Sequence, residues 1–143
     1  MALPGAGRCA GGKIDAMALS QRSLRRLLAI VAGVFGAATL VAGGRVLLGA
    51  DPGYVVYLPL LVFNTAMGAA YLFTGVRGWI DARSGRRGAA AILVLNALML
   101  AFIGWLYLAQ PGTVARESVG AMGFRTAVWL VLWGGFAWAA RRA

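Results

Sequence analysis

The chain has 143 residues, 61% of them hydrophobic and only 13% charged, with a mean hydropathy of +0.77 and a net charge of +10. Soluble globular proteins contain about 45–50% apolar residues, so this composition excludes an ordinary soluble domain. In a soluble protein such a positive charge would indicate a nucleic-acid partner. Here the basic residues lie between and beside long apolar stretches, as in membrane proteins, and we expect a lipid bilayer and no nucleic acid as the surroundings.

Four apolar stretches follow one another along the chain, at residues 27–48, 54–76, 89–108 and 124–140. The hydrocarbon core of a bilayer is about 30 Å thick, and a helix crosses it with roughly 20 residues at about 1.5 Å per residue. The first three stretches reach this length, and the fourth lies near the lower limit. The pattern predicts one transmembrane domain of four helices that covers residues 21–143.

The N-terminal region allows two interpretations. Residues 1–20 are small, polar and rich in glycine, and are predicted to form a disordered cytoplasmic tail. The pair Arg25-Arg26 before the first apolar stretch also resembles the start of a signal peptide, whose apolar region spans about 7–15 residues. The stretch here is longer, so an uncleaved first helix is favoured. Translation from Met1 and from Met17 are both compatible with this pattern.

The distribution of basic residues predicts the orientation in the membrane. With the N-terminus inside, eleven of the fourteen basic residues lie on the cytoplasmic side, and only Arg45, Arg116 and Arg125 lie outside. The opposite orientation would reverse this ratio and violate the positive-inside rule. We therefore expect both termini in the cytoplasm of a bacterial cell, with the protein in the inner membrane.

Short connections predict which helices are neighbours. Residues 49–53 contain Asp51, Pro52 and two glycines and are typical of a tight turn, because Pro presets φ and Gly adopts positive φ. Residues 81–88 form a second short connection, and residues 109–123 a longer one. Helices joined in this way form an up-down-up-down bundle, so the predicted fold is an all-α integral membrane protein with four transmembrane helices, N-in and C-in.

Several kinds of chemistry are missing from the predicted spans. The chain has no histidine and one cysteine, Cys9, and its carboxylates all lie in tails or loops; they belong to Asp15, Asp51, Asp81 and Glu117. Proton-coupled transporters usually keep an ionisable group inside the membrane. The small multidrug-resistance exporters, which also have four helices, depend on a glutamate in the first helix that this chain lacks. We expect no enzymatic activity, no catalytic residue, no metal and no cofactor.

A few polar side chains do fall within the spans. Asn64 and Thr65 lie in the middle of the second apolar stretch, and Asn96 lies in the third. A buried amide without a partner is unfavourable, so each asparagine is expected to face the bundle. One interpretation is that these residues hold the helices together. The other is that they line a polar pathway for a small solute or an anion.

A second group of polar residues is predicted at the outer face. Arg45 ends the first apolar stretch, Arg125 opens the fourth, and Asp51 and Glu117 lie in the adjoining loops. Pairing with these acids would neutralise the arginines near the interface. Trp129 follows Arg125 by one helical turn, so the guanidinium could lie over its indole ring. The group would serve orientation and stability, or form an outward site for an anionic group or a partner protein.

The segment 117–129 carries a resemblance. An acid, Glu117, precedes the pair Ala121-Met122, which is followed by Arg125 and then by Trp129. This order resembles a motif in a family of small four-helix bacterial inner-membrane proteins of unassigned function. The second apolar stretch is similar to that family's second helix at four positions, Asn64, Gly68, Tyr71 and Gly75. The resemblance implies a four-helix membrane protein and brings no activity with it.

A looser resemblance concerns permeation. Gly43-Gly44-Arg45 at the end of the first stretch, with Asn64 and Gly68 in the second, is similar to elements of the fluoride channels. The break rich in Thr and Phe in the third helix of those channels is absent from residues 89–108.

The favoured prediction is a non-enzymatic accessory or interaction subunit, in a homodimer or a larger membrane complex. The alternative is a small-solute or anion channel or permease that acts as a homodimer, because four helices rarely enclose a hydrated path alone.

Overall fold

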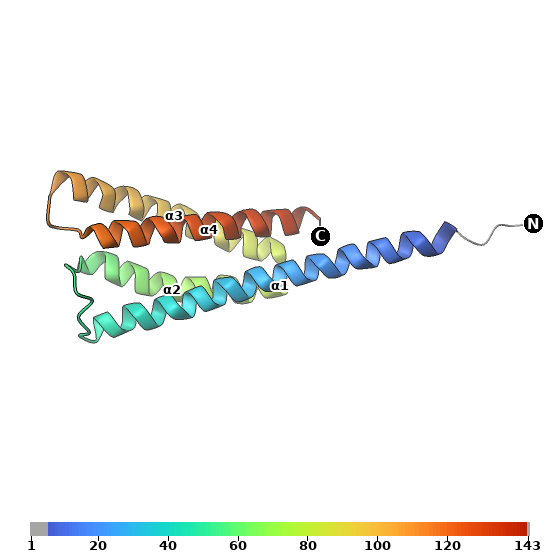
Figure 1. The fold of residues 1–143 in the computed structure, drawn as a ribbon, viewed down its shortest axis with the longest axis horizontal. Coiled ribbons are helices and arrows are strands. Elements are labelled where there is room, and N and C mark those ends of the chain that lie inside the picture. Colours follow the sequence, from blue (N-terminus) through green and yellow to red (C-terminus); the bar gives the residue numbers. More distant parts are fainter. Residues whose placement is uncertain (1–5, 143) are drawn as a thin grey trace, which may run out of the picture.

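Four long helices make up the structured part of the chain (Figure 1). The computed structural model describes the backbone of residues 6–142 and the side chains of residue 15 and residues 17–142. The helices are α1 (Ala6–Leu47), α2 (Leu58–Ile80), α3 (Ala82–Ala109) and α4 (Arg116–Arg141), and no strand occurs in the described residues. All four are long and apolar enough to cross a membrane. The prediction of an all-α chain with four such helices is confirmed.

Successive helices run in opposite directions, and α1 extends far beyond the other three (Figure 1). We call the end with the α1–α2 and α3–α4 connections the outer end of the bundle. The other end, with the α2–α3 junction and the end of α4, is the inner end. The most extensive contacts join α1 to α2 and α3 to α4, whereas α1 and α4, though neighbours, touch much less than these pairs. The bundle is therefore two hairpins packed side by side.

The helices are longer than the apolar stretches that predicted them. α3 begins at Ala82 instead of residue 89, and α4 begins at Arg116 instead of residue 124, so the predicted connections 81–88 and 109–123 are mostly helical. The α2–α3 connection shrinks to Asp81, whose carboxylate accepts hydrogen bonds from the backbone N–H groups of Arg83 and Ser84, at 3.2 and 2.9 Å. Arginine is a good helix former, and the Asp81 cap completes the extended first turn of α3. α4 begins at Arg116 without a side-chain cap.

The N-terminal tail differs most from the prediction. Residues 6–20, predicted to be disordered, continue α1 as one helix of 42 residues, while residues 1–5 lie outside the described part. The apolar turns of α1 supply the nucleus for this helix, and adding residues to a formed helix is far less costly than starting one. The run Ala16–Leu19 consists of good helix formers.

The predicted turn after α1 is confirmed in its backbone, since Gly49 and Gly53 both have positive φ, 102° and 79°.

A seam of glycines brings α1 and α2 into backbone contact. A Cβ atom on Gly36 of α1 would lie 2.7 Å from the backbone N of Leu72 and 2.9 Å from the carbonyl O of Gly68. A Cβ atom on Gly75 would lie 2.9 Å from the carbonyl O of Ala29. No side chain fits in these places, so the two helices approach as closely as their backbones allow, as expected for small residues at four- and seven-residue spacing in lipid.

The side chains are distributed as in a membrane protein. The core consists of three groups of buried apolar residues, with the largest in the middle of the bundle around Tyr71 and Trp129. Many large apolar side chains point outward; Phe73, Val131 and Leu98 are each more than 60% exposed. Such a surface would be unfavourable in water but suits a bilayer, where the hydrophobic effect does not drive the helices together.

Candidate functional site

A hydrogen bond between α2 and α3 lies at the centre of the bundle. The hydroxyl of Tyr71 donates to Oδ1 of Asn96 over 3.1 Å, and both residues have no solvent-accessible surface. The amide Nδ2 of Asn96 is also buried and has no hydrogen-bond partner. The prediction that Asn96 faces the bundle is therefore confirmed, and its partner is Tyr71 rather than Asn64.

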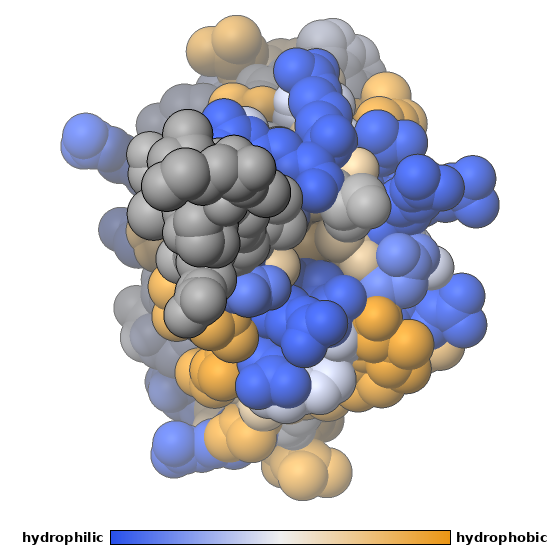
Figure 2. Space-filling model, turned by 90° about the vertical axis from the view of Figure 1, so that its right-hand side faces the viewer, coloured by the Kyte–Doolittle hydropathy of each residue, from blue (hydrophilic) through white to orange (hydrophobic). Residues whose placement is uncertain are grey.

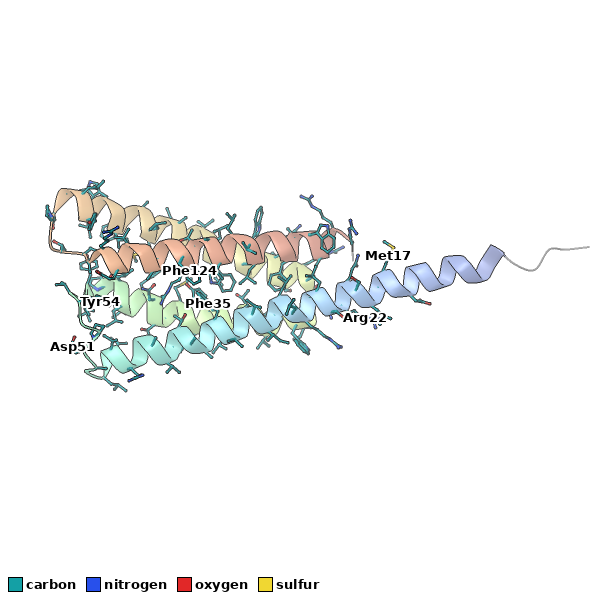
Figure 3. The ribbon with its side chains drawn as sticks, viewed as in Figure 1. Met17, Arg22, Phe35, Asp51, Tyr54 and Phe124 are labelled. Atoms are coloured by element: carbon teal, nitrogen blue, oxygen red, sulfur yellow. The ribbon has the colours of Figure 1, made fainter. Side chains whose placement is uncertain are left out.

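Aromatic rings from three helices close the centre around this bond. The ring of Tyr71 lies 4.7 Å from that of Trp129 in α4 and 5.8 Å from that of Phe35 in α1, measured between centroids. Phe35 in turn faces Phe124 of α4 at 6.3 Å (Figure 3). Aromatic pairs at such distances add to the stability that burial alone provides. One side chain from every helix thus meets at mid-bundle, and the space between them is filled.

Trp129 takes part in this centre instead of lying beneath Arg125. Its ring is fully buried against Tyr71, and its indole Nε1 has no hydrogen-bond partner. The cation–π contacts of the described residues are elsewhere, between Arg26 and Trp79, Arg77 and Phe73, and Arg142 and Trp138. Sequence reasoning missed the role of Tyr71. The available signal was a tyrosine in the middle of an apolar span, since a buried tyrosine hydroxyl usually finds a hydrogen-bond partner.

Asn64 and Thr65 occupy a different place, nearer the outer end. Asn64 lines a small cavity of about 50 Å³ together with Tyr54, Tyr57 and Ser118, and its Oδ1 is buried without a partner. That volume is enough for a water molecule, which needs about 10–15 Å³. The hydroxyl of Thr65 donates to the carbonyl of Leu61 within α2 at 2.8 Å. The same side chain fills the place where a Cβ on Gly43 of α1 would lie, so Thr65 belongs to the α1–α2 seam.

The residues expected at the outer face do not form one cluster. Arg45, Asp51 and Glu117 are all exposed, and over the described residues the structure records no ion pair between these acids and Arg45 or Arg125. Asp51, in the α1–α2 connection (Figure 3), accepts the backbone N–H of Gly53 at 2.8 Å, which is an Asx turn.

The separation of Glu117 from Arg125 has a simple cause. α4 is continuous from Arg116 to Arg141, so Gly120 and Gly123 do not let the chain fold back as predicted. In a bilayer, a break in the helix would leave backbone groups without hydrogen-bond partners, a cost larger than the helix penalty of about 1 kcal/mol per glycine. Arg125 follows Glu117 by eight positions, which correspond to about 12 Å of helix axis.

Arg125 lies well along the length of α4 rather than at the outer end of the bundle. It is nine residues from the start of α4, about 14 Å along the axis, and one turn from the central Trp129. The residue is half-buried, and its Nη1 is inaccessible to solvent and has no hydrogen-bond partner. Tyr71 and Tyr54 lie within electrostatic range, but neither donates or accepts a hydrogen bond with it. This charge has no partner among the described residues.

A groove between α1 and α4 gives access to Arg125. It has a volume of about 260 Å³ and lies between two neighbouring helices that are in sparse contact with each other. Phe35 and Thr39 of α1 form one wall, and Ala121 and Phe124 of α4 form the other, with Arg125 between them. The groove is mainly apolar, it opens to the side of the bundle, and it contains one buried cationic donor.

No known protein family, curated protein or solved structure matches this chain. The class of the protein therefore follows from its fold, which is a small bundle of four helices, each able to span a membrane. Among the described residues there is no group of His, Cys, Asp and Glu that could hold a metal ion. Within the candidate spans, unsatisfied buried polar atoms occur at the centre around Asn96 and Trp129, at Asn64 beside its small cavity, and in the groove at Arg125.

Proposed function

We propose that the protein is a non-enzymatic accessory subunit of a membrane complex, which binds a transmembrane helix of another protein in the α1–α4 groove. An acidic side chain of that helix would pair with Arg125. The observation that carries this proposal is the buried, unpartnered Nη1 of Arg125 in an open, mostly apolar groove. The proposal includes insertion in a bacterial inner membrane with both termini in the cytoplasm, supported by the excess of basic residues on that side.

The energetics favour an acidic partner. An arginine near the centre of a membrane helix costs roughly 2.5–3.5 kcal/mol on insertion-based scales. Ionisable residues at that depth usually face a bundle interior and pair with another group. Here the chain itself supplies no acid within reach of Arg125, so a carboxylate from outside would satisfy both the charge and the free N–H groups.

A second copy of this chain is a poor source of that carboxylate. The positive-inside rule gives every copy the same orientation, so identical residues of two copies lie at the same depth. The acids nearest to Arg125 along the axis are Glu117, in the first turn of α4, and Asp51, in the outer connection. Neither reaches the depth of Arg125 in a parallel pair, which points to a different protein with an acid inside its own span.

The packing of the centre argues against a path through one chain. Tyr71, Asn96 and Trp129 have no accessible surface, and their contacts occupy the middle of the bundle. The cavity beside Asn64 is small and lies nearer the outer end. The alternative function, a homodimeric channel or permease, would need a pathway between two copies instead.

A synthetic helix tests the proposal directly. The probe is a leucine-rich transmembrane peptide with one central Glu, compared with the same peptide carrying Gln, in lipid nanodiscs that hold the full-length protein. A photoreactive residue at Ala121, on the groove wall, reports binding. We expect about tenfold stronger crosslinking of the Glu peptide, equivalent to roughly 1.4 kcal/mol.

Matched variants assign the effect to Arg125. Arg125→Met should remove the preference for Glu over Gln, whereas Arg45→Gln, a charge loss at an exposed outer arginine, should retain it. Equal crosslinking of both peptides to the wild type would overturn the ion pair. Crosslinking only between two copies of the chain would assign the groove to a homodimer and overturn the proposed partner.

A further inference from the structure

A basic pocket lies at the inner end of the bundle, where α1 leaves the other three helices. It has a volume of about 340 Å³ and is lined by Arg22 and Arg25 of α1, by Arg142 after the end of α4, and by Asp81 between α2 and α3. Figure 2 shows this end, with hydrophilic residues gathered around the base of α1. Arg22 lies on α1 near the point where the helix passes the end of the bundle (Figure 3).

The α1 wall of the pocket presents a single helical face. Ala18, Gln21, Arg22 and Arg25 follow the spacing i, i+3, i+4 and i+7, which places all four side chains on one side of the helix. Gln21 and Arg25 are half-buried there. The Nε of Arg25 is inaccessible to solvent and has no hydrogen-bond partner, so one donor of the pocket is already desolvated and free.

Arg142 is held in position by an aromatic ring. Its guanidinium lies over the ring of Trp138, 4.5 Å from the centroid. This contact uses the flat face of the guanidinium and leaves its N–H groups, which lie in the plane, available for a ligand. A planar set of N–H donors matches the oxygens of a phosphate group.

The one carboxylate of the pocket is already engaged. Asp81 accepts the backbone N–H groups of Arg83 and Ser84 with its two different oxygens. The hydrogen bond from the backbone of Ser84 is the largest cause of the lowered pKa of Asp81, so this group stays ionised at neutral pH. Three arginines against one aspartate leave the pocket with an excess of two positive charges.

We infer that this pocket binds a phosphate-bearing anion through Arg22, Arg25 and Arg142. The pocket borders the first residue of α3 and the end of α4, at the level where the candidate spans of α2, α3 and α4 end and where lipid headgroups would lie around an inserted bundle. Basic pockets between helices at such a level hold anionic headgroups. The same chemistry would take the phosphate of an anionic phospholipid or free phosphate, and the site is independent of the groove at Arg125.

Calorimetric titration of the detergent-solubilised, full-length protein tests the inference. The probes are water-soluble, short-chain phosphatidylglycerol, the corresponding phosphatidylcholine, and inorganic phosphate. We expect phosphatidylglycerol to bind at least about tenfold more tightly than phosphatidylcholine, a difference of roughly 1.4 kcal/mol. Competition by inorganic phosphate would show that the phosphate group alone is recognised, and binding without such competition would assign the site to the lipid.

Two variants and one control separate the pocket from general electrostatic attraction. Arg25→Gln and Arg142→Gln should each weaken binding about tenfold, as expected for the loss of one charge-assisted contact to phosphate. Arg83→Gln removes the same charge at the same end but outside the pocket, and should leave binding within about twofold. Arg142 is exposed and follows the last helix, so its variant remains informative if Arg25→Gln does not fold. Absence of binding by both anionic probes, or equal losses in all three variants, would overturn the inference.

Discussion

Tyr71 and Asn96 lie 25 residues apart in the chain and are joined by a buried hydrogen bond of 3.1 Å between α2 and α3. Each side chain is polar in an otherwise apolar layer, and each is placed by a different helix. The rings of Phe35 and Trp129 pack on Tyr71 from the two remaining helices. This pair therefore defines how the two hairpins are rotated relative to each other, which no single span could determine.

Removal of the tyrosine hydroxyl should weaken the bundle. Tyr71→Phe leaves Oδ1 of Asn96 buried without a donor and should lower the free energy of unfolding in detergent by about 1 kcal/mol, within the range of interhelical hydrogen bonds in membranes. Asn96→Leu should have a similar effect. The double variant should lose less than the sum of the two, because they share one bond. Strictly additive losses would show that the bond contributes nothing to stability.

The glycine seam should be intolerant of a single methyl group. Gly36→Ala would place a Cβ atom 2.7 Å from the backbone of α2, so the helices must separate, and we expect a loss of about 1–3 kcal/mol in the free energy of unfolding. Gly104→Ala is the matched control, because no atom lies within 4 Å of its added Cβ. That variant should be neutral or stabilised by up to about 1 kcal/mol through helix propensity. Comparable losses at both positions would contradict close packing at the seam.

The unpaired charge of Arg125 should lower the stability of the isolated protein. Arg125→Met keeps the aliphatic part of the side chain and removes a buried charge without a partner, so the isolated protein should gain on the order of 1 kcal/mol in detergent. Arg116→Gln, at the exposed start of α4, should change thermal stability little. A loss of stability in Arg125→Met, measured by thermal unfolding in detergent, would mean that the guanidinium already has a partner in the isolated chain.

The proposed orientation can be tested with reporter fusions. Fusions at the C-terminus and at Ser84, in the first turn of α3, should both report the cytoplasm, because most basic residues lie on that side. A fusion at Gly112, in the α3–α4 connection, should report the periplasm. A periplasmic signal at the C-terminus would reverse the orientation and place the basic pocket on the opposite side.

Asn64 separates the accessory function from the channel alternative. Asn64→Leu should leave folding nearly intact, since hydrogen bonds between membrane helices average only about 0.6 kcal/mol. Proteoliposomes with the wild-type protein should release fluoride or chloride no faster than protein-free vesicles, as measured with ion-selective electrodes. Wild-type flux that Asn64→Leu abolishes, with the variant still folded, would replace the accessory function by the channel.

Much of this protein can be predicted from local sequence. The hydropathy of a stretch depends only on residues that are neighbours in the chain, so the number of helices follows directly from it. The connection at Gly49 and Gly53 follows from the ability of glycine to adopt positive φ. The inward position of Asn96 follows as well, because an amide among apolar residues avoids lipid. The helix ends were less predictable, since both α3 and α4 begin before their apolar parts, α3 through a segment rich in arginine.

Only the tertiary structure decided which side chains meet. The partner of Asn96 depends on the rotation and register of α2 against α3, so Tyr71 could not be distinguished from Asn64 by spacing alone. The depth of Arg125 depends on where α4 begins, and the start at Arg116 moves this arginine from the expected interface to the wall of a groove. Arg22, Arg25 and Arg142 come from distant parts of the chain and share a pocket because α4 ends beside residues 18–25 of α1. A contact between distant segments is not encoded in any local pattern.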